Sequence, residues 1–146
     1  MKRILLADDD ASVRKALGQL LMLEQFEVAP AASGKEAIAK FKAGPPDLVL
    51  LDLGLPDIDG WEVFEAMQKA HPAVPVILIT AKSHQYRRAS GLRVNAIMEK
   101  PLDIPVLLEA IRNFIAESAG QSSSASARSN IKTVFLGHPE PKNSTA

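Results

Sequence analysis

The chain has 146 residues with 17 basic and 17 acidic side chains, so its formal net charge at pH 7 is zero. Such a balance gives no overall field that would attract nucleic acid or an anionic membrane surface. The absence of cysteine excludes disulfides, thiolate metal ligands and thiol nucleophiles. The first apolar run, Ile4–Ala7, is too short for a signal-peptide core or a membrane span, so we expect a cytoplasmic protein without membrane insertion.

Along the chain, short apolar runs alternate with segments whose apolar residues recur at helical spacing. The runs predict strands at Ile4–Ala7, Phe26–Ala31, Leu48–Leu51, Val76–Ile79 and Ala96–Met98. The segments that follow them predict helices beginning near Ser12, Ser33, Trp61, Ser83 and Ile104. Ser33 and Glu36 have the spacing of a capping box. Five successive strand–helix units predict an α/β fold, a doubly wound five-stranded parallel sheet with helices on both faces.

Polar residues follow four of the expected strands at the point where each strand ends. Asp8 and Asp9 follow the first strand, Asp52 the third, Thr80 the fourth and Lys100 the fifth. Open parallel sheets bind their ligands outside the carboxyl ends of the strands. We therefore expect these side chains at the edge of the sheet where a ligand would bind.

The three carboxylates predict a metal site. At a separation of about 5 Å and an effective dielectric constant of about 20, each pair would repel by about 3 kcal/mol, which a cation would offset. Oxygen ligands without sulfur or imidazole select Mg²⁺, with Mn²⁺ as a substitute. For the acidic triplet 8–10 alone, solvated loop residues and a helix cap at Asp10 or Ser12 are the simpler interpretation. Together with Asp52, the triplet favours a metal site over solvated loop residues.

Asp52 is either a metal ligand only or a nucleophile as well. A carboxylate can attack phosphorus and form an acyl phosphate. The reaction needs a metal, a second cation and a hydroxyl donor for the phosphoryl oxygens, and Lys100 and Thr80 would supply the last two. Taken singly, Thr80 could simply end a strand and Lys100 could be solvated. Their joint occurrence at successive strand ends favours a phosphoryl site.

Four stretches, ILLADDD, PDLVLLDLGLPDIDG, PVILITA and KPLD, stand in an order that resembles the receiver domain of two-component response regulators, which has a flavodoxin-like (βα)5 fold. The resemblance covers Met1 to about Ser118. It implies that Asp52 is the phosphoacceptor. It also implies that Asp9, Asp52 and the backbone carbonyl of Gly54 bind Mg²⁺ directly.

The resemblance further implies that Asp8 holds metal-bound water, that Lys100 pairs with the phosphoryl group and that Thr80 moves toward it. A cis peptide bond is implied at Lys100–Pro101. The phosphoryl donor would be a phosphohistidine of a sensor histidine kinase or a histidine phosphotransfer protein. Such a chain is not an enzyme in the usual sense, because it catalyses only its own phosphorylation and dephosphorylation.

The chain departs from the usual receiver pattern in three places that concern signal output, one of which is Leu102, in place of the common aromatic residue after Lys100–Pro101. Receivers usually carry an aromatic residue three positions before the lysine, and Ile97 stands there instead, which puts coupling by ring rotation in question. The stretch from Thr80 to Lys100 is slightly shorter than usual. We therefore expect the helix over 83–92 to be short, displaced or poorly ordered.

From about Ala119 the composition changes, and GQSSSASARSN is typical of a flexible linker. We expect a receiver domain over 1–118 and a Ser-rich tail over 119–146 without a folded output domain, disordered up to about residue 130. The apolar island IKTVFL, residues 131–136, is expected to dock on an exposed face or a partner. The tail is too short and polar for a DNA-binding domain.

The sequence thus predicts a stand-alone receiver that is a monomer or weak dimer, binds no nucleic acid and docks on an effector protein that the sequence does not identify. The alternative is an interaction module that keeps the fold but works without phosphorylation, which Ile97 and the altered 83–92 region favour. A small phosphatase with an aspartyl-phosphate intermediate ranks last, because Gly54 stands where such enzymes have a second acid.

Overall fold

The computed structural model describes residues 1–81, 94–120 and 134–136. The helix expected over 83–92 therefore lies outside the described residues. The chain divides into two compact units, Met1–Val76 and Ile77–Ala146. Among the described residues, no helix combines the length and the apolar character needed to cross a membrane.

The strands form one sheet in which paired strands run parallel. They are β1 (Arg3–Ala7), β2 (Glu27–Ala31), β3 (Leu48–Asp52), β4 (Val76–Thr80), β5 (Ala96–Glu99) and β6 (Val134–Leu136). Their order in the sheet is β2-β1-β3-β4-β5-β6. The predicted five-stranded parallel fold is confirmed for β1 to β5. The sixth strand, which the sequence analysis did not predict, is added beside β5.

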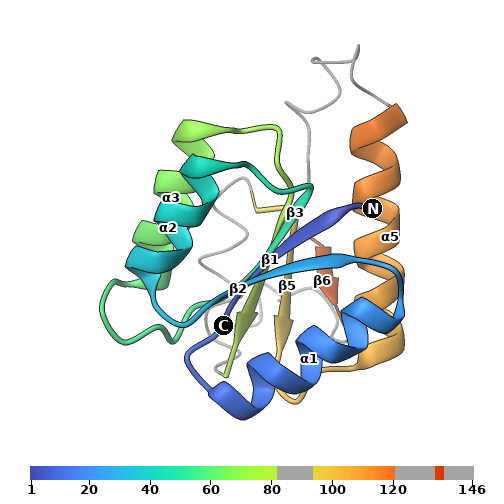
Figure 1. Cartoon of the computed structure of the whole chain (residues 1–146), viewed down its shortest axis with the longest axis horizontal. Helices are drawn as coiled ribbons and strands as arrows, with labels where there is room; N and C mark the ends of the chain where they lie inside the picture. The colour runs from blue at the N-terminus through green and yellow to red at the C-terminus, as the bar shows by residue number, and fades with distance from the viewer. Residues whose placement is uncertain (82–93, 121–133, 137–146) are drawn as a thin grey trace, which may run out of the picture. The chain divides into compact units, whose positions relative to one another are not determined.

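In the first unit, β1 lies between β2 and β3 and pairs with both in parallel. The apolar residues of β1 and β3 are almost completely buried, as continuous apolar runs predict for strands covered on both faces. Helix α1 (Ala11–Leu23) lies on one face of these strands, and α2 (Gly34–Ala43) and α3 (Gly60–Ala70) lie together on the other (Figure 1).

Side chains fix the points at which α1 and α2 begin. Asp10 caps α1, and its carboxylate accepts hydrogen bonds from two backbone N–H groups of the first turn. Ser33 caps α2, as its spacing predicts, and its hydroxyl accepts from the Glu36 N–H at 3.1 Å. The Glu36 carboxylate in turn accepts from the Ala32 N–H at 2.7 Å, one residue before the cap. Of the two residues that the sequence offered as the cap of the first helix, Asp10 and Ser12, Asp10 is the one that caps α1.

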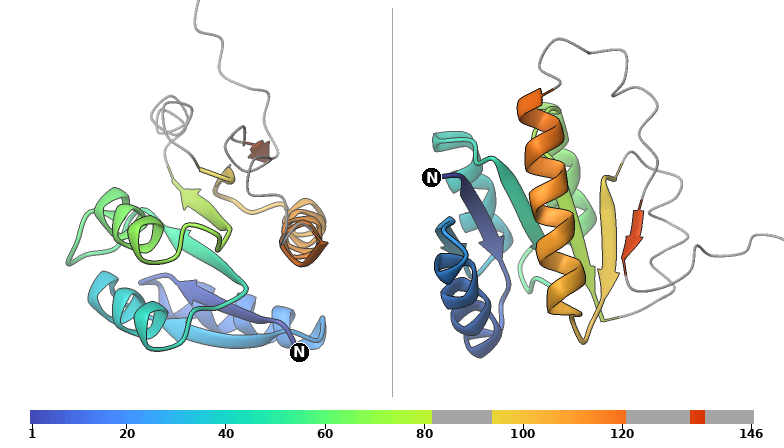
Figure 2. Two further views of the ribbon diagram at one scale, coloured as in Figure 1. Left: turned by 90° about the horizontal axis from the view of Figure 1, so that it is seen from above. Right: turned by 90° about the vertical axis from the view of Figure 1, so that its right-hand side faces the viewer.

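In the second unit, β4 and β5 pair in parallel, and α5 (Ile104–Gly120) follows β5. Helix α5 buries Leu107, Ile111 and Ile115 and ends slightly beyond Ser118, where the sequence placed the end of the domain. Strand β6 runs along β5 on the side away from β4 (Figure 2, right). The end of the apolar island is therefore a strand, while residues 121–133 and 137–146 lie outside the described part of the chain.

Candidate functional site

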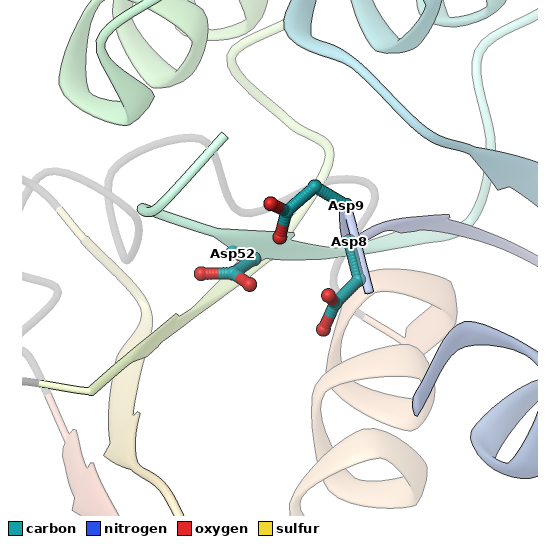
Figure 3. A group of neighbouring side chains, drawn as sticks. All are labelled: Asp8, Asp9 and Asp52. Atoms are coloured by element: carbon teal, nitrogen blue, oxygen red, sulfur yellow. The ribbon is translucent and has the colours of Figure 1, made fainter. Parts of the chain in front are cut away.

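Two neighbouring strands of the first unit end in carboxylates. Strands β1 and β3 pair with Ala7 opposite Leu51, so the next residues, Asp8 and Asp52, reach adjacent positions at the carboxyl edge. Asp9 follows directly. One carboxylate oxygen of each of the three aspartates lies within 4.8 Å of the other two. Figure 3 shows the three side chains gathered at this edge. The structure thus brings together the three acids that the sequence placed here.

The three carboxylates differ in their exposure. Asp8 is 1% exposed and Asp52 is 4% exposed, whereas Asp9 is open to solvent. At an effective dielectric constant of about 20, two full charges 4.8 Å apart repel by about 3 kcal/mol. A buried like-charge pair of this kind is unfavourable unless another group compensates it. This burial distinguishes the cluster from an ordinary group of surface acids.

Neutral backbone groups and one arginine hold the cluster in place. The Asp10 N–H donates to Asp8 Oδ1 at 2.9 Å, and the Gly54 N–H donates to Asp52 Oδ1 at 2.8 Å. The Arg14 guanidinium on α1 donates to the Asp8 carbonyl oxygen at 2.7 Å. The two N–H bonds orient the carboxylates but do not remove their negative charge. Arg14 was not among the residues singled out from the sequence, because its spacing to Asp8 indicated only a helical position.

The donor set fits a hard divalent cation. All three side-chain donors are carboxylate oxygens, and no imidazole joins them in the one such cluster found among the described residues. Carboxylate oxygens are ligands that Mg²⁺ and Mn²⁺ prefer in proteins. The Asp9 carboxylate of the cluster is exposed to solvent. Asp8, Asp9 and Asp52 are therefore the side chains that would hold such an ion.

Gly54 lies close to the Asp52 carboxylate. A Cβ atom at this position would stand 3.3 Å from Asp52 Oδ1, closer than most real Cβ contacts. A side chain here would therefore crowd the carboxylate that the Gly54 N–H binds. The role of the Gly54 carbonyl as a metal ligand stays a prediction.

The loop after β3 is tied down by a contact that sequence reasoning missed. Asp57 accepts hydrogen bonds from the backbone N–H groups of Gly34 at 2.7 Å and Lys35 at 3.0 Å, at the start of α2. The Gly34 N–H, followed by that of Lys35, holds the pKa of the Asp57 carboxyl below its ordinary value. At the other end of the loop, a Cβ on Gly60 would stand 2.5 Å from the Cα of Leu53. The loop thus closes tightly on itself.

Thr80 and Lys100 belong to the second unit. Thr80 ends β4 and is 3% exposed, and Lys100 follows β5 and is partly buried. The Lys100 N–H donates to the Thr80 carbonyl oxygen at 2.8 Å, so a backbone hydrogen bond connects the two residues. The peptide bond between Lys100 and Pro101 is cis, as the resemblance implied. Ile97, which stands where receivers usually have an aromatic residue, is completely buried in β5.

The sequence matches a known protein family that agrees with the strand order and with the acids at the strand ends. Residues 4–112 match the model of the response regulator receiver domain. The chain belongs to this receiver family. The resemblance recognised from its motifs is therefore confirmed.

Curated relatives of this receiver include longer regulators. It is 33% identical over 119 residues to the transcriptional regulatory protein TrcR of Mycobacterium tuberculosis, a match that covers 80% of this chain and 46% of TrcR. It is 35% identical over 138 residues to the probable transcriptional regulator ycf27 of Porphyridium aerugineum, which covers 93% of this chain and 57% of that protein. The receiver thus spans about half the length of these relatives.

Solved structures similar to this receiver include response regulator proteins. A CheY-like receiver domain protein from Methanospirillum hungatei has a TM-score of 0.78 and 31% identity, over 83% of this chain and 98% of that one. The response regulator TrrA of Thermotoga maritima, solved in complex with Mg²⁺ and BeF, has a TM-score of 0.73 and 35% identity. That match covers 78% of this chain and 99% of TrrA.

Proposed function

We propose that Asp52 accepts a phosphoryl group in a Mg²⁺-dependent reaction from a phosphohistidine of a sensor histidine kinase or a histidine phosphotransfer protein. The receiver then signals by docking on another protein. The buried pair of Asp8 and Asp52, with the exposed Asp9 beside it, is the observation that carries this proposal. Carboxylates held this close together attract a divalent cation. The relative TrrA, which binds Mg²⁺ and BeF, supports the choice of ion.

In the proposed reaction, a carboxylate oxygen of Asp52 forms a bond to phosphorus as the P–N bond of the phosphohistidine breaks and the imidazole leaves. The Gly54 N–H, bound to Asp52 Oδ1, holds the nucleophilic carboxylate in a fixed orientation. Asp9, Asp52 and the Gly54 carbonyl would hold the ion, and Asp8 would hold its water. When bound, the ion neutralises charge on the phosphoryl oxygens.

Lys100 and Thr80 are proposed to bind the remaining phosphoryl oxygens through an ammonium and a hydroxyl group. Because a backbone hydrogen bond connects the two residues, a displacement of one residue is transmitted to the other. The phosphoryl group adds about −1.5 to −2 charges, which favours conformations that bring cations and donors toward it. The output is then a shift between two conformations that a partner protein distinguishes. The receiver acts on itself and not on a separate substrate.

A second candidate function is docking that needs no phosphorylation. The completely buried Ile97 favours it, because a branched aliphatic side chain locked in the core cannot report on Thr80 by rotating as an aromatic ring would. The acid cluster argues against it, since a scaffold alone has no use for a buried pair of like charges.

Incubation with acetyl phosphate and Mg²⁺, followed by intact mass measurement, tests the proposal. We expect one phosphoryl adduct, which is lost with EDTA and in Asp52→Asn. Asp103→Asn is a matched control, since Asp103 is exposed, bonds the Val106 N–H, and would be replaced by another good helix-capping residue. It should be modified like the unaltered chain. No adduct and no Mg²⁺ binding would leave the docking module as the function.

A further inference from the structure

The outer edge of β5 is covered by a segment from the end of the chain. Strand β6 pairs in parallel with β5, with Ala96 opposite Val134, Ile97 opposite Phe135 and Met98 opposite Leu136. Leu136 is 8% exposed. Strand β5 therefore has a partner on each side, β4 and β6, although only β4 comes from the repeating strand–helix pattern (Figure 2).

Without β6, β5 would be an open edge strand. Its residues Ala96, Ile97 and Met98 are apolar and almost completely buried, it contains no proline, and its one charged residue, Glu99, is the last of the strand. An edge with these properties offers unpaired N–H and C=O groups to any extended segment that approaches, because charge, proline and bulges are the usual protection. The chemistry of β5 thus favours an extended apolar strand as its partner.

The connection between α5 and β6 is long enough to bring that strand to the edge. Residues 121–133 separate Gly120, the last residue of α5, from Val134. Helix α5 runs back against the direction of β5, so its end lies toward the end of the sheet where β6 begins (Figure 2, right). Thirteen residues can span at most about 45 Å. Together with α5 they make a crossover longer than the dozen residues that parallel strands require.

We propose that the outer edge of β5 is a binding site for an extended apolar segment, and that the chain's own Val134–Leu136 occupies it reversibly. A strand of three residues makes few contacts, so the isolated segment binds weakly. Because it belongs to the same chain, its local concentration at the edge is on the order of mM, which keeps the site mostly filled when the dissociation constant of the segment lies below that concentration. When the segment leaves, the edge accepts a matching strand from another molecule.

Hydrogen exchange on the full chain tests the occupancy. Phe135→Pro removes a backbone donor from β6 and should release the strand. We expect the amides of β5 to exchange faster by about tenfold, the effect of losing about two ordinary hydrogen bonds. Exchange in β1 and β3 should not change, which also shows that the variant is folded. Ser124→Pro, which introduces the same residue outside β6, is the matched control and should leave β5 unchanged.

A labelled peptide with the sequence IKTVFLG, residues 131–137, tests the binding site directly. We expect saturable binding to the Phe135→Pro chain and at least about tenfold weaker binding to the unaltered chain, whose site is already filled. The same peptide with proline in place of phenylalanine should not bind. Leu136→Asp provides a second way to release β6. Unchanged β5 exchange in both variants, or equal peptide binding to all chains, would overturn the proposal. The proposed binding at the edge of β5 does not depend on phosphorylation of Asp52.

Discussion

Asp8 and Asp52 hold two like charges close together in a buried setting, and a substitution at Asp8 isolates their repulsion. In Asp8→Asn the amide oxygen can still accept the Asp10 N–H, so the local hydrogen bond is kept. Without divalent ions we expect the free energy of unfolding to rise by up to about 3 kcal/mol, which is the full repulsion less what the other partners of the two carboxylates already offset. Urea unfolding in EDTA measures it. A loss of stability would show that the pair is already compensated.

Gly18 and Gly60 form a matched pair of glycines with opposite expected responses to alanine. At Gly18, inside α1, an added Cβ would meet only Leu6 and Val28 at 3.9 Å, which is ordinary contact. Gly18→Ala should therefore stabilise the chain by about 0.5 to 1 kcal/mol through helix propensity. At Gly60 the Cβ would overlap the backbone of Leu53. Gly60→Ala should cost about 1 to 3 kcal/mol. Urea unfolding of both variants tests this order.

At the scale of elements, the start of α2 is held by two carboxylates whose ionisation links stability to pH. The pKa of Asp57 lies below its ordinary value of 3.8 because it accepts the Gly34 and Lys35 N–H groups. The pKa of Glu36 lies below 4.5, chiefly because of the Ala32 N–H and then Lys40. A lowered folded-state pKa adds stability above the unfolded-state value, and this stability is lost as the pH falls through the folded-state value.

We therefore expect the contribution of these two groups to be complete above about pH 6 and to decline as the pH falls below about 4.5. In Asp57→Asn, stability at pH 7 should fall, because the charged acceptor is lost, and the decline on acidification should become shallower. Denaturant unfolding from pH 7 to pH 3 measures both quantities. Asp103→Asn again serves as the control, and an equally steep acid decline in Asp57→Asn would contradict the link.

The sequence predicted those elements whose cause is local. Apolar runs and helical spacing located all the strands of the repeating pattern, and Ser33 and Asp10 marked helix starts. Asp57 was missed because its partners, Gly34 and Lys35, lie far along the chain, and nothing in the local pattern couples them. Strand β6 was missed for a similar reason. An apolar island shows that a segment needs a partner, but the partner, β5, is set by long-range pairing.

In the candidate site, the grouping of the acids was predictable from the sequence, but their burial was not. Parallel strands bring their carboxyl ends to one edge, so Asp8, Asp9 and Asp52 could be placed together from strand order alone. Their unequal burial, which carries the argument for a cation, depends on how the surrounding loops close over them. The Arg14 bond to the Asp8 carbonyl likewise requires the position of α1 on the sheet.

At the scale of the whole molecule, the binding of Mg²⁺ should stabilise the folded chain by mass action. At a concentration of about 100 times the dissociation constant, we expect the free energy of unfolding to rise by about 2.7 kcal/mol. Thermal unfolding with increasing Mg²⁺ measures the effect, and EDTA should reverse it. Asp52→Asn should lose most of the gain. An equal gain in that variant would place the ion elsewhere.

Trp61 is the only tryptophan of the chain, and it is buried in the first turn of α3, within Met1–Val76. Indole emission during denaturation consequently reports on this unit alone, whereas far-ultraviolet circular dichroism sums the helices of both. Two superimposable transitions would mean that the chain melts as one cooperative body. Separate midpoints would mean that the unit with the acid cluster unfolds before or after the part of the sheet that carries Thr80 and Lys100.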